Sequence, residues 1–270
     1  MNKEFLSSER RRYLKEQKRR KRMILLTQVL IILLFLGLWE LLAQLGVIDS
    51  FIMSSPSRIG KTLLNFQNNG LLLHISTTVA ETVVGFALGT LIGTLLAVVF
   101  WWSEFLAKVS EPFLVVLNSL PKVALGPVII IWVGAGTEAI IVMALAISTI
   151  VAVLEMLGGF LATDRELLRM ARTFGASRMQ SFLKIVLPYN IRTLFNSLKV
   201  NIGLSLVGVI TGEFLVSKAG LGYLIVYGGQ VFKLDLVMSS VIILAVLAAL
   251  LYRGVLLLER LVVRRLSHTS

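Results

Sequence analysis

The stretch that comes closest to a catalytic motif is SPSRIGKT, residues 55 to 62. A phosphate-binding loop ends in the same Gly-Lys-Thr, where backbone amides cradle phosphates and the lysine and threonine serve phosphate and magnesium. Ser55 stands where that motif needs its first glycine, so we expect a proline-led turn into an amphipathic helix instead. The chain has no cysteine, two histidines, His74 and His268, and no HExxH or GxSxG pattern. The sequence therefore predicts no catalytic site, no metal site and no cofactor, and the chain is not expected to be an enzyme.

Several polar residues lie inside strongly apolar segments, where such groups should face protein or water rather than lipid. Pro121 and Pro127 are expected to interrupt one of these segments, because proline lacks an N–H and breaks the helical hydrogen-bond ladder. Two interpretations of the adjacent Lys122 stay open: it lines a polar path through the membrane, or its ammonium group extends to the lipid headgroups. Lys199, in a later segment, is expected to extend to the headgroups. Five polar or small residues of that later segment share a helical face that should look inward: Ser197, Asn201, Ser205, Gly208 and Gly212.

A third group of residues forms a polar segment, 161 to 193, with six Lys or Arg and two acids. Asp164 can cap a first short helix and Ser177 a second, because their side chains can accept hydrogen bonds from free backbone N–H groups. Gly175 can take the left-handed conformation that ends the first helix, and Pro188 is expected to end the second. Whether the segment packs on the protein's own helices or on a partner protein stays open. Each helix carries an apolar face at helical spacing: Leu167, Leu168, Ala171 and Phe174, then Met179, Phe182, Leu183 and Val186.

The elements that hold these residues are membrane spans, since 56% of the 270 residues are hydrophobic and the mean hydropathy is +0.85. Soluble domains hold about 45–50% apolar residues. Gly85, Gly89 and Gly93 recur every four residues in one span and predict close packing against a neighbouring helix. The fold class expected is an all-α integral membrane protein. Runs long enough to cross about 30 Å of hydrocarbon predict six transmembrane helices, near residues 23–45, 76–102, 113–133, 138–160, 194–216 and 236–258.

The distribution of basic residues predicts the topology of these spans. Residues 1–22 hold ten Lys or Arg against three acids, and basic segments beside membrane spans remain cytoplasmic. We interpret this tail as an anchor beside anionic lipid rather than a segment that binds nucleic acid. The first span is too long for a signal-peptide core. The expected organisation is a cytoplasmic tail at 1–22, a first span at 23–45, an extracytoplasmic loop with an amphipathic helix at 46–75, a core at 76–258 with its cytoplasmic loop at 161–193, and a cytoplasmic tail at 259–270.

One pattern in the polar segment carries a family resemblance. Gly175, nine residues, Ile185, one residue, then Leu187 and Pro188 match the G-x9-I-x-L-P half of the EAA loop in permease subunits of bacterial ATP-binding-cassette importers. Three further stretches resemble the nitrate, sulfonate and taurine branch of that family: SPSRI, LPKVALGPVIIIWVGAG and GEFLVSKAGLGYLI. The resemblance covers most of residues 50 to 260 in the expected order. One departure is that the family's Glu-Ala-Ala triplet falls on Arg169, Met170 and Ala171.

The resemblance implies a MetI-like permease fold with six transmembrane helices and a cytoplasmic coupling-helix loop. It assigns the contact with a cytoplasmic ABC ATPase subunit to a set of loop residues: Arg169, Ala171, Phe174, Gly175, Ile185, Leu187 and Pro188. The reversed charge at Arg169 suggests a differently charged groove on the ATPase. The residues expected to approach the translocation path are Asn118, Pro121, Lys122, Asn201 and Ser205.

The implied function is that of the transmembrane permease subunit of an ATP-driven importer in the bacterial inner membrane. An extracytoplasmic binding protein would deliver the solute, and a second permease copy would complete the path through the bilayer. A cationic Lys122 favours a small anionic solute such as a sulfonate, taurine or nitrate. The alternative is an ion-coupled secondary transporter or channel that acts without an ATPase, which would place carboxylates at the membrane midplane.

Overall fold

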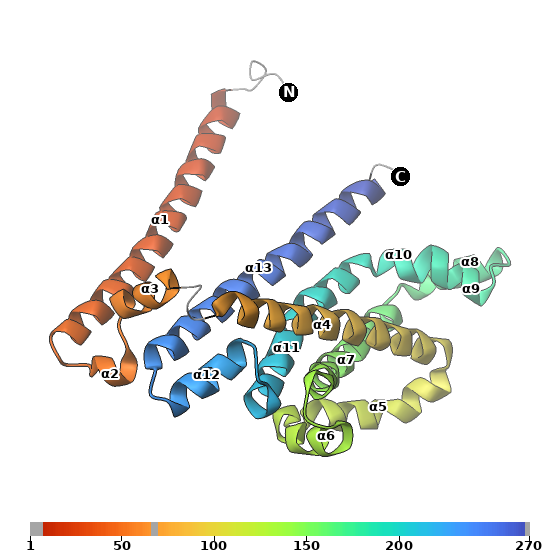
Figure 1. Ribbon diagram of the computed structural model, residues 1–270. Coiled ribbons are helices and arrows are strands. Elements are labelled where there is room, and N and C mark those ends of the chain that lie inside the picture. The colour runs from red at the N-terminus through yellow and green to blue at the C-terminus, as the bar shows by residue number, and fades with distance from the viewer. Residues whose placement is uncertain (1–7, 66–69, 268–270) are drawn as a thin grey trace. The chain divides into compact units, whose positions relative to one another are not determined.

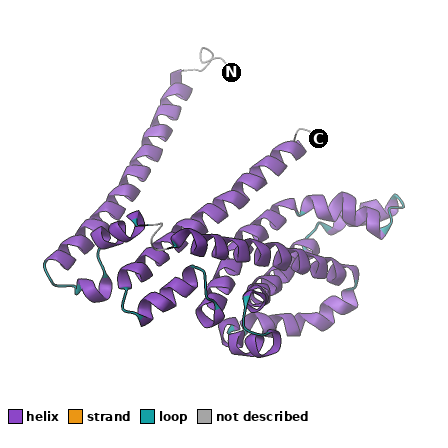
Figure 2. Cartoon of the chain, viewed as in Figure 1, coloured by secondary structure: helices purple, strands orange, loops and turns teal. Residues whose placement is uncertain are grey.

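The computed structural model describes residues 8–65 and 70–267, and within these residues it consists of helices, turns and loops without a strand (Figures 1 and 2). The chain divides into two units, residues 1–64 and 65–270. In the first unit, α1 (Ser8–Gln44) runs without interruption from the basic residues into the apolar span. Two short helices follow it, α2 (Ser50–Met53) and α3 (Pro56–Leu64). Helix α3 is the proline-led amphipathic helix that the sequence predicts in place of a nucleotide-binding loop.

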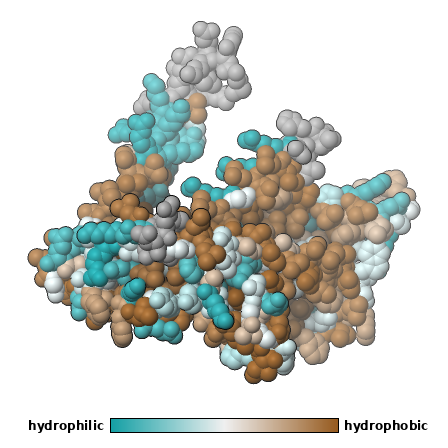
Figure 3. Space-filling view, viewed as in Figure 1, coloured by the Kyte–Doolittle hydropathy of each residue, from teal (hydrophilic) through white to brown (hydrophobic). Residues whose placement is uncertain are grey.

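The second unit begins with α4 (Leu71–Trp102) and ends with α13 (Leu234–Ser267). Its other long helices are α7 (Thr137–Leu161) and α11 (Ile191–Val216), and α12 (Leu221–Gln230) precedes α13. Five helices of the described residues are long and apolar enough to cross a membrane, or six if one bent pair counts as a single span. Hydrophobic residues accordingly cover much of the visible surface, including most of α13 (Figure 3).

The bent pair corrects the third predicted span, which the sequence places at 113–133. Helix α5 (Glu104–Ser119) begins nine residues earlier, where Ser103 caps it by accepting from Leu106 N at 3.3 Å. A 3₁₀ turn at Lys122–Leu125 and helix α6 (Gly126–Val133) follow, bent by 90° from α5. Pro121 marks the break as expected. Pro127 does not break a helix but begins one, because the first turn of a helix needs no N–H there.

Helices α4, α7 and α11 form the packed centre of the second unit. The predicted small-residue stripe is confirmed: a Cβ added at Gly85, Gly89 or Gly93 would lie within 2.6 Å of a side-chain atom of α7. The α7 residues that face this stripe are Ala144, Ser148 and Ala152, which are also spaced four apart. Two matching rows of small residues thus let the helix backbones approach closely.

The polar face predicted for α11 is buried in the same place, as expected. A Cβ at Gly208 would lie 2.6 Å from the Cα of Ala144, and Ser205 Oγ donates to the carbonyl of Thr82 in α4 at 3.2 Å. Lys199 has a partner that was not predicted. Its ammonium group lies 2.8 Å from Glu259 of α13, so it forms an ion pair between helices.

Candidate functional site

The polar segment predicted at 161–193 folds into four short helical pieces between α7 and α11. These are α8 (Arg165–Thr173), α9 (Arg178–Ser181), a π-helical turn at Phe182–Val186, and α10 (Leu187–Tyr189). We call residues 164–190 the docking segment. Its surface is more hydrophilic than that of the long helices (Figure 3).

The turn between α8 and α9 confirms the predicted glycine stop. Gly175 has a φ of +78°, the left-handed conformation that other residues adopt at a cost. Its N–H bonds to the carbonyl of Arg172 at 2.9 Å, and the N–H of Ala176 bonds to that of Ala171 at 3.0 Å. This pair of hydrogen bonds is a Schellman motif, which satisfies carbonyls left free at the helix end. The angle between α8 and α9 is therefore fixed by backbone hydrogen bonds.

Both predicted caps are present. Asp164 Oδ1 accepts from Glu166 N at 2.8 Å at the start of α8. Ser177 and Gln180 form a reciprocal capping box at the start of α9, in which Gln180 N donates to Ser177 Oγ at 3.2 Å and Ser177 N donates to Gln180 Oε1 at 2.8 Å. Two backbone donors at the start of α9 are thereby satisfied by side chains. We call the turn between α8 and α9, at Gly175, the elbow.

Pro188 does not end the second helix, contrary to the prediction. It occupies the first turn of α10, where its missing N–H does no harm. The preceding turn widens to a π-helix, in which Leu187 N donates to the carbonyl of Phe182 five residues back. The helix ends instead at Asn190, whose side-chain amide donates to Thr163 Oγ1 at 2.9 Å. That hydrogen bond, buried and spanning 27 residues, closes the base of the docking segment.

The apolar faces of the docking segment are divided between the protein's own core and the surface. Phe182 and Val186 are buried among residues of α4 and α7, with the Phe182 ring 5.0 Å from Trp101 and 5.5 Å from Phe160. Leu168 packs against the same cluster. Burial of two large side chains contributes roughly 3–6 kcal/mol at about 1.5–3 kcal/mol each. The segment is thus anchored to the bundle.

Five other apolar residues of α8 and of the helical pieces after it are exposed, and we call them the apolar stripe: Leu167, Met170, Phe174, Met179 and Leu183. Phe174 is 84% exposed, at the turn that carries Gly175. Each predicted face is divided in the structure. On the first, Leu168 and Ala171 are partly buried while Leu167 and Phe174 are exposed; on the second, Phe182 and Val186 are buried while Met179 and Leu183 are exposed. The spacing of apolar residues in the sequence predicts that they share one side of a helix. It does not predict which of them another helix covers. The apolar stripe is suited to a protein partner.

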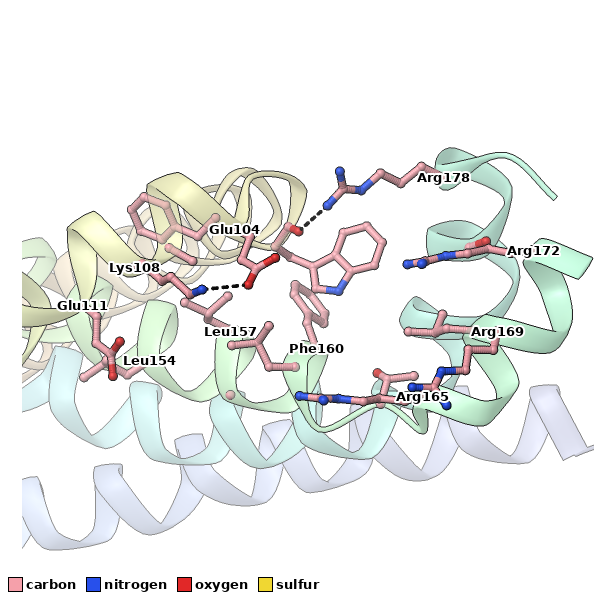
Figure 4. A pocket seen from close by; sticks show the side chains of 18 of the residues that line it. Glu104, Lys108, Glu111, Leu154, Leu157, Phe160, Arg165, Arg169, Arg172 and Arg178 are labelled. Atoms are coloured by element: carbon pink, nitrogen blue, oxygen red, sulfur yellow. Dashed lines mark hydrogen bonds and ion pairs between the residues drawn. The ribbon is translucent and has the colours of Figure 1, made fainter. Parts of the chain in front are cut away.

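A hollow of about 1190 Å³ lies beside the docking segment, between α5, α7, α8 and α9. Arg165, Arg169, Arg172 and Arg178 line it, and Figure 4 shows these side chains extending from the docking segment toward the side that carries Glu104 and Lys108. Glu104 and Lys108 form an ion pair of 2.9 Å. Arg169, which the family resemblance aligns with an acidic position, therefore lies on the hollow rather than on the apolar stripe.

The five residues predicted on a translocation path fall into two groups. Asn118, Pro121 and Lys122 lie at the break between α5 and α6, where the Lys122 ammonium group donates to the carbonyl of Asn118 at 2.8 Å. Asn201 and Ser205 are fully buried in the packed centre, and Asn201 Nδ2 donates to both the carbonyl and the hydroxyl of Ser197 at 3.0 Å. No hydrogen bond described in residues 8–65 and 70–267 joins the two groups.

A buried polar cluster at the other end of α11 was not predicted from the sequence. Glu213 accepts from Thr78 Oγ1 of α4 at 2.6 Å and from Gly222 N at 2.5 Å. Thr78 Oγ1 in turn accepts from Leu221 N at 2.8 Å, and His74 Nδ1 accepts from Gly220 N at 3.0 Å. The loop between α11 and α12 is thereby attached to α4. The available signal was the stretch GEFLVSKAGLGYLI, which contains the glutamate and both glycines.

This arrangement has counterparts among known proteins. The family described as binding-protein-dependent transport system inner membrane component matches residues 89–268. The chain belongs to this family. The sequence is 29% identical to a probable ABC transporter permease protein of Haemophilus influenzae, over 80% of this chain and 87% of that protein. It is also 29% identical to the riboflavin transport system permease protein RibX of Chloroflexus aurantiacus, over 86% of this chain and 87% of that protein.

Two further comparisons concern the branch and the fold of this permease. The taurine transport system permease protein TauC of Escherichia coli is 24% identical over 83% of this chain and 84% of its own length, so the predicted resemblance to the sulfonate and taurine branch is confirmed. The MetNI methionine ABC transporter, in an inward-facing conformation, superposes with a TM-score of 0.63. That superposition covers 70% of this chain and 94% of the other at 20% identity, and it confirms the MetI-like fold.

Proposed function

We propose that this permease is the membrane-spanning subunit of an ATP-driven importer and that a cytoplasmic ABC ATPase subunit binds its apolar stripe. The observation that carries the proposal is the division of the docking segment: Phe182 and Val186 are buried in the bundle, while Phe174 and Met170 remain exposed. A segment anchored on one side and apolar on the other can transmit movement of a partner to the bundle. The proposed contact also includes the residues aligned with the family motif: Ala171, Gly175, Ile185, Leu187 and Pro188, with Arg169 at its edge.

The proposed topology puts the docking segment and both chain ends in the cytoplasm. The basic residues support this orientation, since the docking segment and the start of α1 carry most of the Lys and Arg outside the spans. An extracytoplasmic binding protein would then meet the opposite end of the bundle, where the Glu213 cluster holds the α11–α12 loop. The same positive charge makes anionic lipid, and not nucleic acid, the neighbour of the tail.

The proposed path for solute passes the break between α5 and α6, where Asn118, Pro121 and Lys122 lie. Two copies of the chain would face one another there, and the exposed Ile131 and Trp132 of α6 would contact lipid or the second copy. The positive charge of Lys122 would favour a small solute that carries an anionic group. Taurine, which the name of one relative contains, carries such a group, a sulfonate. Asn201 and Ser205 would reach the path only after α4 and α11 separate, because both side chains are buried between helices.

The test is a charge placed in the apolar stripe. We expect Phe174→Asp to weaken binding of the cognate ATPase subunit more than about tenfold, since a buried aromatic anchor at an interface contributes about 2 kcal/mol or more. Co-purification in detergent and ATP-dependent uptake in proteoliposomes measure the effect. The matched control is Tyr13→Asp, because Tyr13 is 64% exposed on the basic part of α1.

The same measurements separate the importer from an ion-coupled transporter. Phe174→Asp should lose ATPase binding and uptake together, while Tyr13→Asp keeps both. Uptake by the purified permease alone, driven by an ion gradient without ATP, would contradict the proposal. So would normal ATPase binding by Phe174→Asp.

A further inference from the structure

Three of the arginines beside the hollow form a stripe of their own on α8. Arg165, Arg169 and Arg172 are spaced four and three residues apart, which places them on one side of the helix. This side faces the hollow, whereas Leu167, Met170 and Phe174 form the apolar stripe on another. No carboxylate in the described part of the chain forms an ion pair with these three arginines. The same short helix therefore carries two distinct surfaces.

The charges around the hollow are unbalanced. Arg178 and Lys108 join the three arginines of α8, so five basic side chains line the hollow against two acids, Glu104 and Glu111. Glu104 is already paired with Lys108. The surplus of positive charge around the hollow would attract an anion. Arginine is the side chain best suited to phosphate, because its planar donors bind two oxygens at once.

The side of the hollow that faces the arginines carries charged residues of α5, Glu104, Lys108 and Glu111, and beside them an apolar wall from long helices (Figure 4). Leu154, Leu157 and Leu161 of α7 line it, together with Leu114 of α5. An inorganic ion would make no favourable contact with the leucines. A phospholipid would, because its acyl chain could lie along them while its headgroup reached the arginines.

Two tryptophans beside Arg178 support a position of the hollow near a membrane surface. Arg178 lies over the rings of Trp101 and Trp102, 5.5 and 5.6 Å from their centroids, and donates to the carbonyl of Trp101 at 3.2 Å. Tryptophans gather at the level of the lipid headgroups. Leucines, a tryptophan and arginines thus line the same hollow, the three kinds of side chain that suit an acyl chain, a lipid interface and an anionic headgroup.

We propose that the hollow binds an anionic phospholipid, with its phosphate between Arg165, Arg172 and Arg178 and one acyl chain along the leucines of α7. Basic pockets between helices at a cytoplasmic membrane surface are known to hold such headgroups. The bound lipid would lie between α5 and the docking segment. This inference does not rest on the proposed transport function, because lipid binding is measured without ATPase or solute.

Native mass spectrometry of the full-length protein in detergent tests the proposal. The probes are phosphatidylglycerol and phosphatidylcholine with identical acyl chains. We expect the protein to retain phosphatidylglycerol more tightly, and Arg165→Gln/Arg172→Gln to weaken that binding about 30-fold, from the usual contribution of two basic side chains near anionic lipid. The matched control is Arg253→Gln/Arg260→Gln, which removes the same charge from exposed positions of α13 and should leave the tight binding unchanged.

Three results would overturn the lipid proposal. In the first, both double variants lose phosphatidylglycerol equally, so that only net charge matters. In the second, inorganic phosphate alone displaces the lipid at millimolar concentration. In the third, phosphatidylcholine binds as tightly as phosphatidylglycerol. Identical elution of the two variants in size-exclusion chromatography, and retention of Phe182 packing as reported by tryptophan fluorescence of the Trp101 region, exclude unfolding as the cause of a loss.

Discussion

Among single residues, Glu213 is a buried carboxyl group that is held by two different elements. Its side chain is 1% exposed, and its two oxygens accept from different elements, Thr78 of α4 and Gly222 of α12. A Cβ added at Gly220 or Gly222 would lie within 3 Å of this glutamate. The two glycines are therefore required because the carboxyl group occupies the space beside them. A buried polar group this well satisfied fixes the loop that follows α11.

Replacing Thr78 by valine tests that cluster. Valine keeps the shape of threonine but removes the hydroxyl that donates to Glu213 Oε1 and accepts from Leu221 N. We expect a loss of about 1–3 kcal/mol in stability, measured as a lower thermal midpoint in detergent. Thr78→Ser keeps the hydroxyl and should stay close to the wild type. Equal midpoints for the two variants would show that the hydroxyl contributes nothing.

At the scale of elements, two rows of small residues hold α4 against α7. Gly85, Gly89 and Gly93 meet Ala144, Ser148 and Ala152, so that no side chain larger than serine separates the helices along this line. Dispersion contacts between close backbones stabilise such pairs in lipid, where no hydrophobic effect draws helices together.

Exchanging the small and the larger residue at the contact between Gly89 and Ser148 tests the packing of α4 against α7. A Cβ at Gly89 would lie too close to Ser148 Oγ, so Gly89→Ala should cost about 1–3 kcal/mol through overpacking. Adding Ser148→Gly removes the obstructing atoms and should restore most of the loss. Gly203→Ala is the control, because nothing lies within 4 Å of a Cβ there. A double variant as unstable as Gly89→Ala alone would contradict the packing account.

The sequence predicted these elements unevenly, for physical reasons. The glycine stripe, the Gly175 stop and the Ser177 cap depend on local geometry and were predicted correctly. The start of α5 was not, because Glu104, Lys108 and Glu111 lower the hydropathy of its first turns. Pairings between distant residues leave no local signal, as with Lys199 and Glu259. The division of the apolar faces in the docking segment depends on what covers them, and only the tertiary structure contains that information.

At the scale of the whole molecule, the docking segment is held at its base and at its elbow. The hydrogen bond from Asn190 to Thr163 joins its two ends, and the Schellman motif at Gly175 sets the angle between α8 and α9. A segment restrained at both places moves as one body. Coupling to a partner would then depend on the elbow angle as well as on the apolar stripe.

A valine at Gly175 should impair transport more than stability. Nothing lies within 4 Å of a Cβ there, so the side chain fits, but a φ of +78° is strained for a β-branched residue. We expect a cost of about 1–2 kcal/mol, normal membrane insertion, and a large loss of ATP-driven uptake in proteoliposomes. Gly254→Val, at a helical position with open space around it, should transport normally. Unimpaired uptake by Gly175→Val would remove any role for the elbow angle.

Helix α11 joins the two ends of this unit. It begins at Ile191, directly after the residue that closes the base of the docking segment, and reaches Glu213 near its other end. Twenty-six residues of α-helix extend about 40 Å. The helix is thus about as long as a bilayer is thick. Thr163 bonds to Asn190 directly before its first residue, and Thr78 bonds to Glu213 near its last. A displacement of the docking segment would therefore reach the α11–α12 loop through this one helix, and we expect the two ends of α11 to move together.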